Sequence, residues 1–242
     1  MNEHLLLENV RGVLVRLEET IIFALIERAQ FRRNGRVYVP GAFGPAVGGE
    51  NLTGYLLQRT EIIHAGMRRY TSPDEMPFFH DLPEPLLPPL RFDESPLRPN
   101  AVNINPRIRL TYEAEMVPLL CPPGDDQQYG STAVCDVACL QALSKRIHYG
   151  KFVAEGKYRR QESALAPLIA AGDGAALCHA ITDPAVEAAV LERVERKARN
   201  YSREVAGEGG EDLPDRIREV YRRWVIPLTK DVETEYLLAR RA

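Results

Sequence analysis

Two cations, Arg146 and Lys157, lie eleven residues apart in the segment "SKRIHYGKFVAEGKYRR". In an α-helix this spacing returns both side chains to nearly the same face, about 16 Å apart along the axis. The residues between them on that face are mostly small: Gly150, Val153 and Ala154. A solvated basic face is the commoner explanation for a Lys/Arg pair, but such a face does not need a trough of small residues between the two cations. The pattern therefore favours a site that binds a small molecule with two separated negative charges, one held by the bidentate guanidinium.

Arg11 is a third candidate cation. It lies at the edge of an apolar stripe, with Leu7 at i−4 and Leu14 at i+3. It is therefore either an arginine whose stem covers apolar surface or a further cation of the same site.

Two acids stand in apolar stripes. Glu187 and Glu233 are each followed by an apolar residue at i+4, and Thr229 lies one turn before Glu233. An acid in such a stripe is either ion-paired, the commoner case, or has a raised pKa. Asp183 in "TDPAVE" precedes a proline and is explained by a role as helix N-cap alone.

The chain contains no motif for covalent or metal chemistry. It lacks a Gly-x-Ser-x-Gly elbow, a phosphate-binding glycine loop and a His-Glu-x-x-His pair. Cys135 and Cys139 are one helical turn apart, but the five histidines are scattered and supply no obvious further zinc ligands. We therefore expect reduced thiols, no metal and no cofactor, and a site suited to binding and electrostatic catalysis.

Composition excludes several classes of partner. A net charge of −3 over 242 residues gives no reason to expect nucleic acid or an anionic membrane. No apolar run is long enough to span a bilayer. The amphipathic, acid-containing N-terminal stretch resembles neither a secretory signal nor a transit peptide, so a cytoplasmic protein is expected.

The elements that must position these residues are helices. Apolar residues recur with helical spacing, and almost no segment alternates with period two. The fold class predicted is all-α, a single domain over 1–242 built as one bundle of long helices. Helices are predicted over these approximate ranges: 5–26, 52–70, 106–120, 129–160, 163–171, 173–181, a helix from 182, and 214–240 with a kink at Pro227.

The stretches between these helices carry turn and loop signals. Residues 36–50 form a Gly/Pro loop, and the proline-rich residues 71–105 are expected to cross the surface as an extended connection. Within this connection "SPDE" at 72–75 predicts a helix start, with Ser72 as N-cap.

Five blocks of the sequence resemble, in order, the eukaryotic, yeast-type, all-helical chorismate mutases. The blocks are "NVRGVLVRLEETIIFALIERAQF", "MRRYTSPDEMPFF", "SKRIHYGKFVAEGKY", "TDPAVEAAVLERV" and "VIPLTKDVETEYLLARR". The resemblance implies a homodimer of type II fold that rearranges chorismate to prephenate, an intramolecular Claisen step towards phenylalanine and tyrosine, without cofactor or metal. The substrate is a dicarboxylate, which suits two cations on one helix.

The resemblance also implies a role for each candidate. The cations Arg11, Arg146 and Lys157 would hold the carboxylates, and Lys157 would reach the ether oxygen as well. Glu187 would accept a hydrogen bond from the ring hydroxyl, and protonated Glu233 would donate one to the ether oxygen. Two further residues would lie at the substrate: Thr229, holding a carboxylate, and Asp183, where the yeast-type pattern has Asn and the small bacterial helical mutases have Asp.

An effector site for tyrosine and tryptophan at the dimer interface is implied too. The matching positions are Arg68, Arg69, Gly130, Ser131 and Val134. Val134 replaces a threonine of the family pattern, and Leu213 replaces another in the segment that switches the two states. An effector pocket is therefore expected whose selectivity or coupling is altered.

Two other functions fit part of the pattern. One is a lyase acting on isochorismate, which uses a similar dicarboxylate pocket in relatives of this fold. The other is a non-catalytic sensor of aromatic amino acids. The retained acids Glu187 and Glu233 argue against the lyase, and the pair of Lys157 with Glu233 argues against the sensor.

Overall fold

The computed structural model describes residues 7–88, 97–205 and 211–241. All regular secondary structure among these residues is helical, which confirms the all-α prediction. No described helix is both long and apolar enough to cross a membrane. The helices have the following bounds: α1 (Leu7–Ala29), α2 (Leu52–Gly66), α3 (Asn105–Thr111), α4 (Val117–Leu120), α5 (Tyr129–His148), α6 (Gly150–Arg160), α7 (Glu162–Ala171), α8 (Gly174–Ile181), α9 (Pro184–Val205), α10 (Leu213–Val220) and α11 (Ile226–Leu238).

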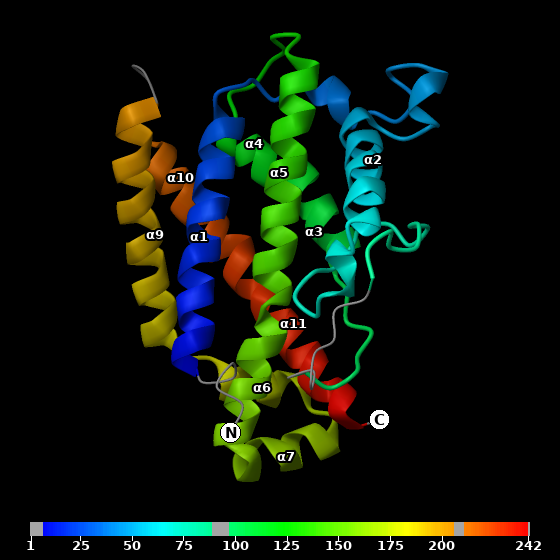
Figure 1. Ribbon diagram of the computed structural model, residues 1–242. Helices are drawn as coiled ribbons and strands as arrows, with labels where there is room; N and C mark the ends of the chain where they lie inside the picture. The colour runs from blue at the N-terminus through cyan, green and yellow to red at the C-terminus, as the bar shows by residue number, and fades with distance from the viewer. Residues whose placement is uncertain (1–6, 89–96, 206–210, 242) are drawn as a thin grey trace.

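The long helices run side by side and one rod crosses them. In Figure 1, α9, α1, α5 and α2 stand roughly parallel, and α10 with α11 passes obliquely behind α1 and α5. Helix α1 packs against α5 and α9, and α11 packs against α6, α8 and α5. The main core lies between these layers, with Ile22, Leu25, Leu140 and Val232 fully buried. Helices α1 and α11, far apart in the sequence, therefore both pack against α5 and α6.

The helix predicted over 129–160 is interrupted at a single residue. Tyr149 separates α5 from α6, but its φ of −61° and ψ of −15° stay in the helical region, so the axis continues. The next residue, Gly150, lets α11 approach closely. A Cβ on Gly150 would lie 3.0 Å from the Thr229 carbonyl oxygen and 3.3 Å from Glu233 Cγ. The interpretation of Gly150 as part of an open trough is thus wrong, because α11 occupies that space.

A π-helical turn lies immediately before the proline expected to kink the last helix. The turn spans Tyr221–Val225, where the Ile226 N–H donates to the Tyr221 carbonyl, and Pro227 follows. The same arrangement occurs at the π turn Tyr112–Met116, ahead of the proline in α4. Proline has no N–H and cannot make the i→i−4 hydrogen bond of an α-helix. The π turn before each proline accommodates one extra residue in the helical turn.

The prediction that a helix starts at Ser72 is wrong. The structure has one turn there, in which the Glu75 N–H donates to the Ser72 carbonyl over 3.2 Å. Pro77 disfavours helical geometry at Met76, so the turn does not propagate. The acids that resembled a first helical turn instead bind Lys145 of α5, whose Nζ lies 3.1 Å from Asp74 Oδ2 and 2.6 Å from Glu75 Oε1.

The proline-rich connection is confirmed where the structure describes it. Residues 72–88 and 97–104 contain no helix, and α3 begins at 105. The second predicted helix is shorter than expected, because α2 ends at Gly66 and a 3₁₀ turn, Arg69–Thr71, follows.

Candidate active site

Arg146 and Lys157 converge on two neighbouring turns of α11. Arg146 Nη1 donates to Thr229 Oγ1 over 3.4 Å, and Lys157 Nζ donates to Glu233 Oε2 over 2.7 Å. Thr229 and Glu233 are four residues apart, so their side chains share one face of α11. The two cations are about 16 Å apart along their own helix, but their flexible arms bring the charged heads together. The structure thus unites four of the residues selected from the sequence.

Arg146 is a buried cation whose hydrogen-bonding capacity is largely unused. Only 5% of the residue is exposed, and the bond to Thr229 is its one side-chain hydrogen bond within the described part of the chain. Its Nε is buried without a partner. A buried charge without compensation is costly unless a ligand supplies the opposite charge. The guanidinium is therefore suited to bind a carboxylate from outside the chain.

Lys157 links three helices at the same place. Besides Glu233 on α11, its Nζ donates to the carbonyl of Ile181, at the end of α8, over 2.7 Å. A quarter of its side chain remains exposed. An ammonium held between two fixed oxygens at the edge of solvent can turn to a ligand without leaving the site.

Glu233 is almost completely buried, with 4% exposure. Desolvation by burial raises the pKa of its carboxyl above the ordinary value, although Lys157 and Arg146 favour the ionised form and oppose the shift. Both alternatives left open for an acid in an apolar stripe therefore apply to Glu233, which is ion-paired with Lys157 and has a raised pKa.

Glu187 is ion-paired, the commoner of the two alternatives for an acid in an apolar stripe, and its partner is a lysine that was not among the candidates from the sequence. Its Oε1 lies 3.0 Å from Nζ of Lys230, so the pair links α9 to α11. Lys230 directly follows Thr229 in α11. The sequence signal that could have indicated it is that Glu187, an acid in an apolar stripe, needs a cation from another helix. Asp183 is exposed and caps α9, as predicted, because its Oδ1 accepts from the N–H groups of Ala185 and Val186 over 3.1 and 3.2 Å.

Arg11 is exposed on α1, which packs against both α5 and α6. Among the described residues it has no hydrogen bond or ion pair, so the structure places it near these helices without joining it to the four central residues.

The effector candidates fall into two separate groups within one chain. Gly130, Ser131 and Val134 belong to the first turns of α5, and Val134 is 59% exposed. Arg69 instead contacts α5 at Gln141, where its Nη1 donates to Oε1 over 3.1 Å. Gln141 is ten residues beyond Ser131, which is about 15 Å along the helix. One chain does not bring the two groups together.

Both arginines of that set have partners within the chain. Arg69 binds Glu75 at 3.1 Å and contacts His64 Nδ1 at 2.8 Å, while Arg68 has a left-handed backbone with φ of 59° and donates to the Pro88 carbonyl. The start of α5, in contrast, has no side-chain cap. Its first N–H groups are therefore available to an anion.

The described residues contain no group of three or more His, Cys, Asp or Glu side chains placed to hold a metal ion. The four cysteines are free thiols, and Cys121 and Cys139 are buried.

Comparison with known proteins gives one consistent result. Residues 128–234 match the family model described as chorismate mutase type II. The chorismate mutase of Schizosaccharomyces pombe is 48% identical over 248 residues, spanning 99% of this chain and 98% of its own. The crystal structure of AtCM1 with tyrosine in its allosteric site has a TM-score of 0.91 at 45% identity, covering 100% of this chain and 99% of that one. The Candida albicans chorismate mutase Aro7p in complex with L-Trp has a TM-score of 0.88 at 39% identity, covering 98% and 92%.

Proposed function

This chain belongs to the chorismate mutase family and has chorismate mutase activity, and we propose that the cluster of Arg146, Lys157, Thr229 and Glu233 between α5, α6 and α11 is its active site. One observation carries the assignment of the site. Arg146 is a buried guanidinium with an unpartnered Nε, and it lies beside a lysine and a buried acid that share one face of α11. A carboxylate of a bound substrate would supply the opposite charge, and the neighbouring cation Lys157 suits a ligand that carries a second one.

The proposed mechanism is conformer selection followed by electrostatic stabilisation. Arg146 binds one carboxylate of chorismate, and Arg11 binds the other from α1. Both carboxylates are then held so that the enolpyruvyl arm folds over the ring. The reaction is intramolecular, so holding chorismate in this conformer lowers the barrier through orientation.

Lys157 and Glu233 act at the breaking C–O bond. In the ligand-free site they bind each other over 2.7 Å. With chorismate present, Lys157 turns to the ether oxygen, where negative charge develops. Glu233 then loses its cation and faces a dianion, so its carboxyl takes up a proton and donates to the same oxygen.

Three further residues complete the proposed site. Thr229, whose hydroxyl accepts a hydrogen bond from Arg146, supports the carboxylate that Arg146 holds. Glu187 accepts from the ring hydroxyl and is oriented by Lys230. Asp183, an exposed cap at the start of α9, lies four residues before Glu187 at the edge of the site.

The test of this assignment follows both possible products. The purified protein is mixed with chorismate, and loss of chorismate is measured together with formation of prephenate. Isochorismate is supplied in parallel, and release of pyruvate is measured. Prephenate from chorismate supports the proposal. Pyruvate from isochorismate as the main reaction would favour the lyase, and binding without turnover would favour the sensor.

The pH profile of catalysis depends on Glu233. Below its pKa the carboxyl carries a proton and donates a hydrogen bond, whereas above it the carboxylate repels the developing negative charge. Burial raises that pKa, so kcat/KM should fall as pH rises through it, with an optimum on the acid side of neutrality. Glu233→Gln keeps the shape and donates at every pH. Measured from about pH 5 to 9, the variant should lack the alkaline fall and keep the acid-side activity. Identical alkaline limbs in the two proteins would show that another group titrates.

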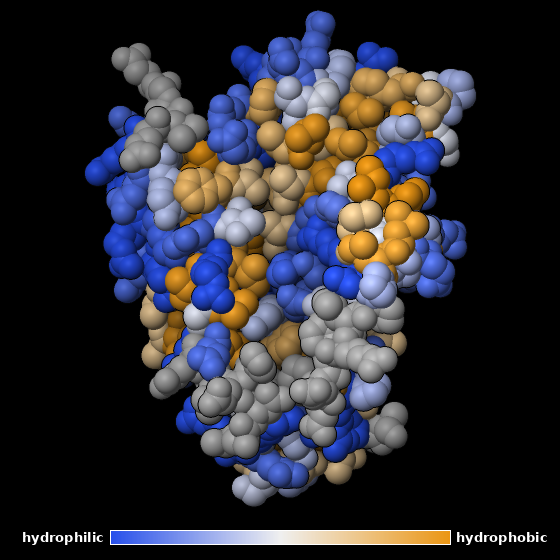
Figure 2. Space-filling model, in the orientation of Figure 1, coloured by the Kyte–Doolittle hydropathy of each residue, from blue (hydrophilic) through white to orange (hydrophobic). Residues whose placement is uncertain are grey.

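We also propose a homodimer with an effector site that spans the two subunits. Ile63, Met67 and Leu86 are 66%, 50% and 80% exposed and lie together where α2 ends, because the Leu86 N–H donates to the Gly66 carbonyl. Figure 2 shows apolar residues gathered on that side of the molecule. Pairing of two copies there would cover this surface. It would also explain why, within one chain, Arg69 contacts α5 at Gln141, about 15 Å along the helix from Ser131.

Regulation by amino acids should be weak. Val134 offers no hydroxyl at an exposed position of α5, and Leu213 is 6% exposed in the main core, where it makes no polar contact that a switch could exchange. A lost hydrogen bond costs about 0.5–1.5 kcal/mol. Activity measured against tyrosine and tryptophan concentration should show weak inhibition and weak activation. Val134→Thr should strengthen the response to tyrosine. Strong opposite responses of the unchanged protein at sub-millimolar concentration would contradict this expectation.

Two further proposals concern the extent of the domain and the location of the protein. We propose that residues 1–242 form a single catalytic domain, which is supported by the packing of α1 and α11 on the same two helices. A cytoplasmic location is supported by the four free thiols, because such thiols persist in reducing compartments.

A further inference from the structure

Lys151 is a buried ammonium on the side of α6 that faces away from the candidate active site. It follows Arg146 by five residues, a rotation of about 140° around the helix. Only 1% of the residue is exposed, and its one hydrogen bond in the described part of the chain goes to the sulfur of Met76, over 3.5 Å. A thioether is a weak acceptor, so the charge lacks a strong partner. Chorismate in the proposed site would not reach it.

Lys151 is one of the residues that line a hollow of about 470 Å³ between α6 and the proline-rich connection. That volume falls in the range of small-molecule sites. Most of the other lining residues are apolar: Pro73, Met76, Leu97 and Pro99. The polar ones are Asn100 and Arg98.

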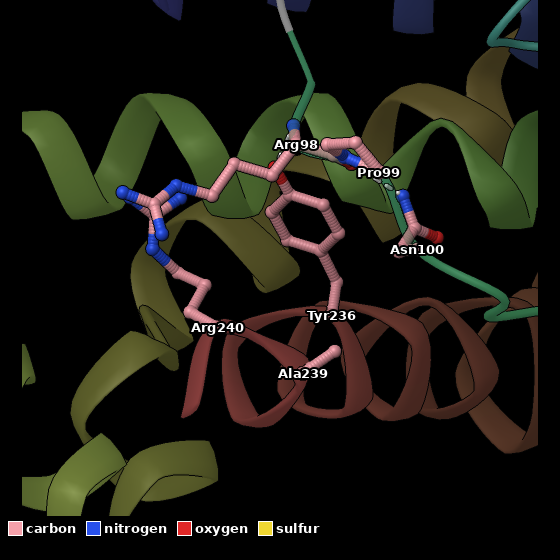
Figure 3. Close-up of a pocket in the computed structure, with 6 residues that line it drawn as sticks. All are labelled: Arg98, Pro99, Asn100, Tyr236, Ala239 and Arg240. Atoms are coloured by element: carbon pink, nitrogen blue, oxygen red, sulfur yellow. Dashed lines mark hydrogen bonds between the residues drawn. The ribbon is translucent and has the colours of Figure 1, made fainter. Parts of the chain in front are cut away.

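Neither of these polar residues neutralises the ammonium. Asn100 is already engaged, since its Nδ2 donates to the Arg98 carbonyl over 2.9 Å and its Oδ1 accepts from the Val102 N–H over 3.2 Å. The guanidinium of Arg98 turns towards that of Arg240 in the adjoining hollow, as Figure 3 shows. Of the two cations that line the larger hollow, Lys151 is therefore the one whose charge is available to a ligand there.

No residue in the described part of the chain supplies a negative charge to Lys151. Burial lowers the pKa of its ammonium to about 8. The neighbouring imidazole, His148, supplies no negative charge, and burial lowers its own pKa to about 4. The other cation that lines the hollow, Arg98, supplies no negative charge either. A bound anion would reverse this and raise the pKa of Lys151.

We propose that this hollow binds a small apolar monocarboxylate, whose carboxylate contacts Lys151 while its body packs against Met76 and Leu97. One ammonium matches one carboxylate. The apolar lining favours an aromatic or branched aliphatic body, since such a body removes apolar surface from water on both sides. Phosphate would keep most of its oxygens without donors there and is expected to bind more weakly.

Benzoate is the probe, and the methyl signal of Met76 reports its position. The chain has four methionines, so a spectrum of protein labelled with methyl-¹³C methionine is simple, and Met76→Leu identifies the signal. Benzoate titrated into the full-length protein should shift the Met76 signal in a saturable manner. Lys151→Leu should weaken this response by about tenfold or more. Its fold is expected to persist, because an apolar side chain replaces an uncompensated buried charge.

Three controls separate this hollow from other carboxylate sites. Lys197→Leu removes the same charge from an α9 lysine that pairs with Glu19 at 2.8 Å, and should leave the benzoate response unchanged. Arg146→Ala disables the proposed substrate site and should leave the Met76 response intact, so this outcome does not depend on the mutase assignment. Inorganic phosphate should shift the signal less than benzoate does.

The proposal is overturned by any of three results. These are a Met76 signal that benzoate does not move at millimolar concentration, an equal response in Lys151→Leu, and a response lost in Arg146→Ala but retained in Lys151→Leu. As a second measurement, selective acylation of Lys151 followed against pH should show a pKa that rises when benzoate is present. An unchanged pKa would contradict contact between the carboxylate and the ammonium.

Discussion

Lys157→Ala should lower kcat/KM of the mutase reaction by well over tenfold. The substitution removes a preorganised charge from the breaking C–O bond, and loss of one such group typically costs about 2.7–4 kcal/mol of transition-state stabilisation. The structure supports the position of this charge, since Lys157 Nζ is fixed between the Ile181 carbonyl and Glu233. Steady-state kinetics with chorismate measures the effect. If the variant kept more than about a tenth of kcat/KM, equivalent to a loss below about 1.4 kcal/mol, the proposed role would be wrong.

Two controls separate this electrostatic effect from damage to the fold. Lys197→Ala removes an α9 lysine that pairs with Glu19 of α1, and this variant should retain full activity. In Lys157→Ala itself, Glu233 loses its ion partner, so the pKa of this buried acid should rise further. The circular dichroism spectrum should stay helical, because a buried acid without its cation becomes protonated before it unfolds the bundle.

Arg28→Met should lower the free energy of unfolding by about 3–5 kcal/mol, the cost typical of removing one partner from a buried ion pair. Arg28 and Asp136 have fully buried side chains, and Arg28 Nε lies 2.7 Å from Asp136 Oδ1. Arg28 also donates to the carbonyls of Arg32 and Arg33, each over 3.0 Å, at the end of α1. The substitution leaves the carboxylate buried without its cation.

Three hydroxyl groups would still bind Asp136 in that variant. Tyr112 donates over 2.7 Å, and Tyr38 and Thr53 each over 2.9 Å. These bonds hold the carboxylate in place without neutralising it, so the loss should be large but not abolish folding. Urea unfolding measures it. Arg222→Met removes an exposed arginine that pairs with Glu219 and should leave stability nearly unchanged. Equal losses in the two variants would contradict the importance of the buried pair.

Helical register was predictable from the sequence because it depends on residues a few positions apart. The spacing of Arg146 and Lys157 placed both cations on one face, and Asp183 before Pro184 marked the start of α9. The position of Glu233 among apolar neighbours indicated either an ion pair or a raised pKa, and the structure has both. Each of these properties follows from neighbours within one or two turns.

Local patterns failed where a distant segment competes for the same groups. "SPDE" has the residues of a helix start, but its acids bind Lys145, about 70 residues later in the chain. Gly150 suggested open space for a ligand, and α11 fills it. Lys230 was not selected at all, because its partner Glu187 lies on another helix.

By itself the sequence determined the all-α fold class, the faces of the helices and the kinds of charge that line the site. The tertiary structure alone decided which charges meet. Lys157 pairs with Glu233, whereas Arg146 is buried with an unpartnered Nε and Lys151 contacts only a thioether among the described residues, although all three cations lie on the consecutive helices α5 and α6. The two groups of effector residues lie apart within the chain for the same reason. Burial and ion pairing depend on which helices pack together, and that packing joins residues too distant in the chain for any local spacing to predict.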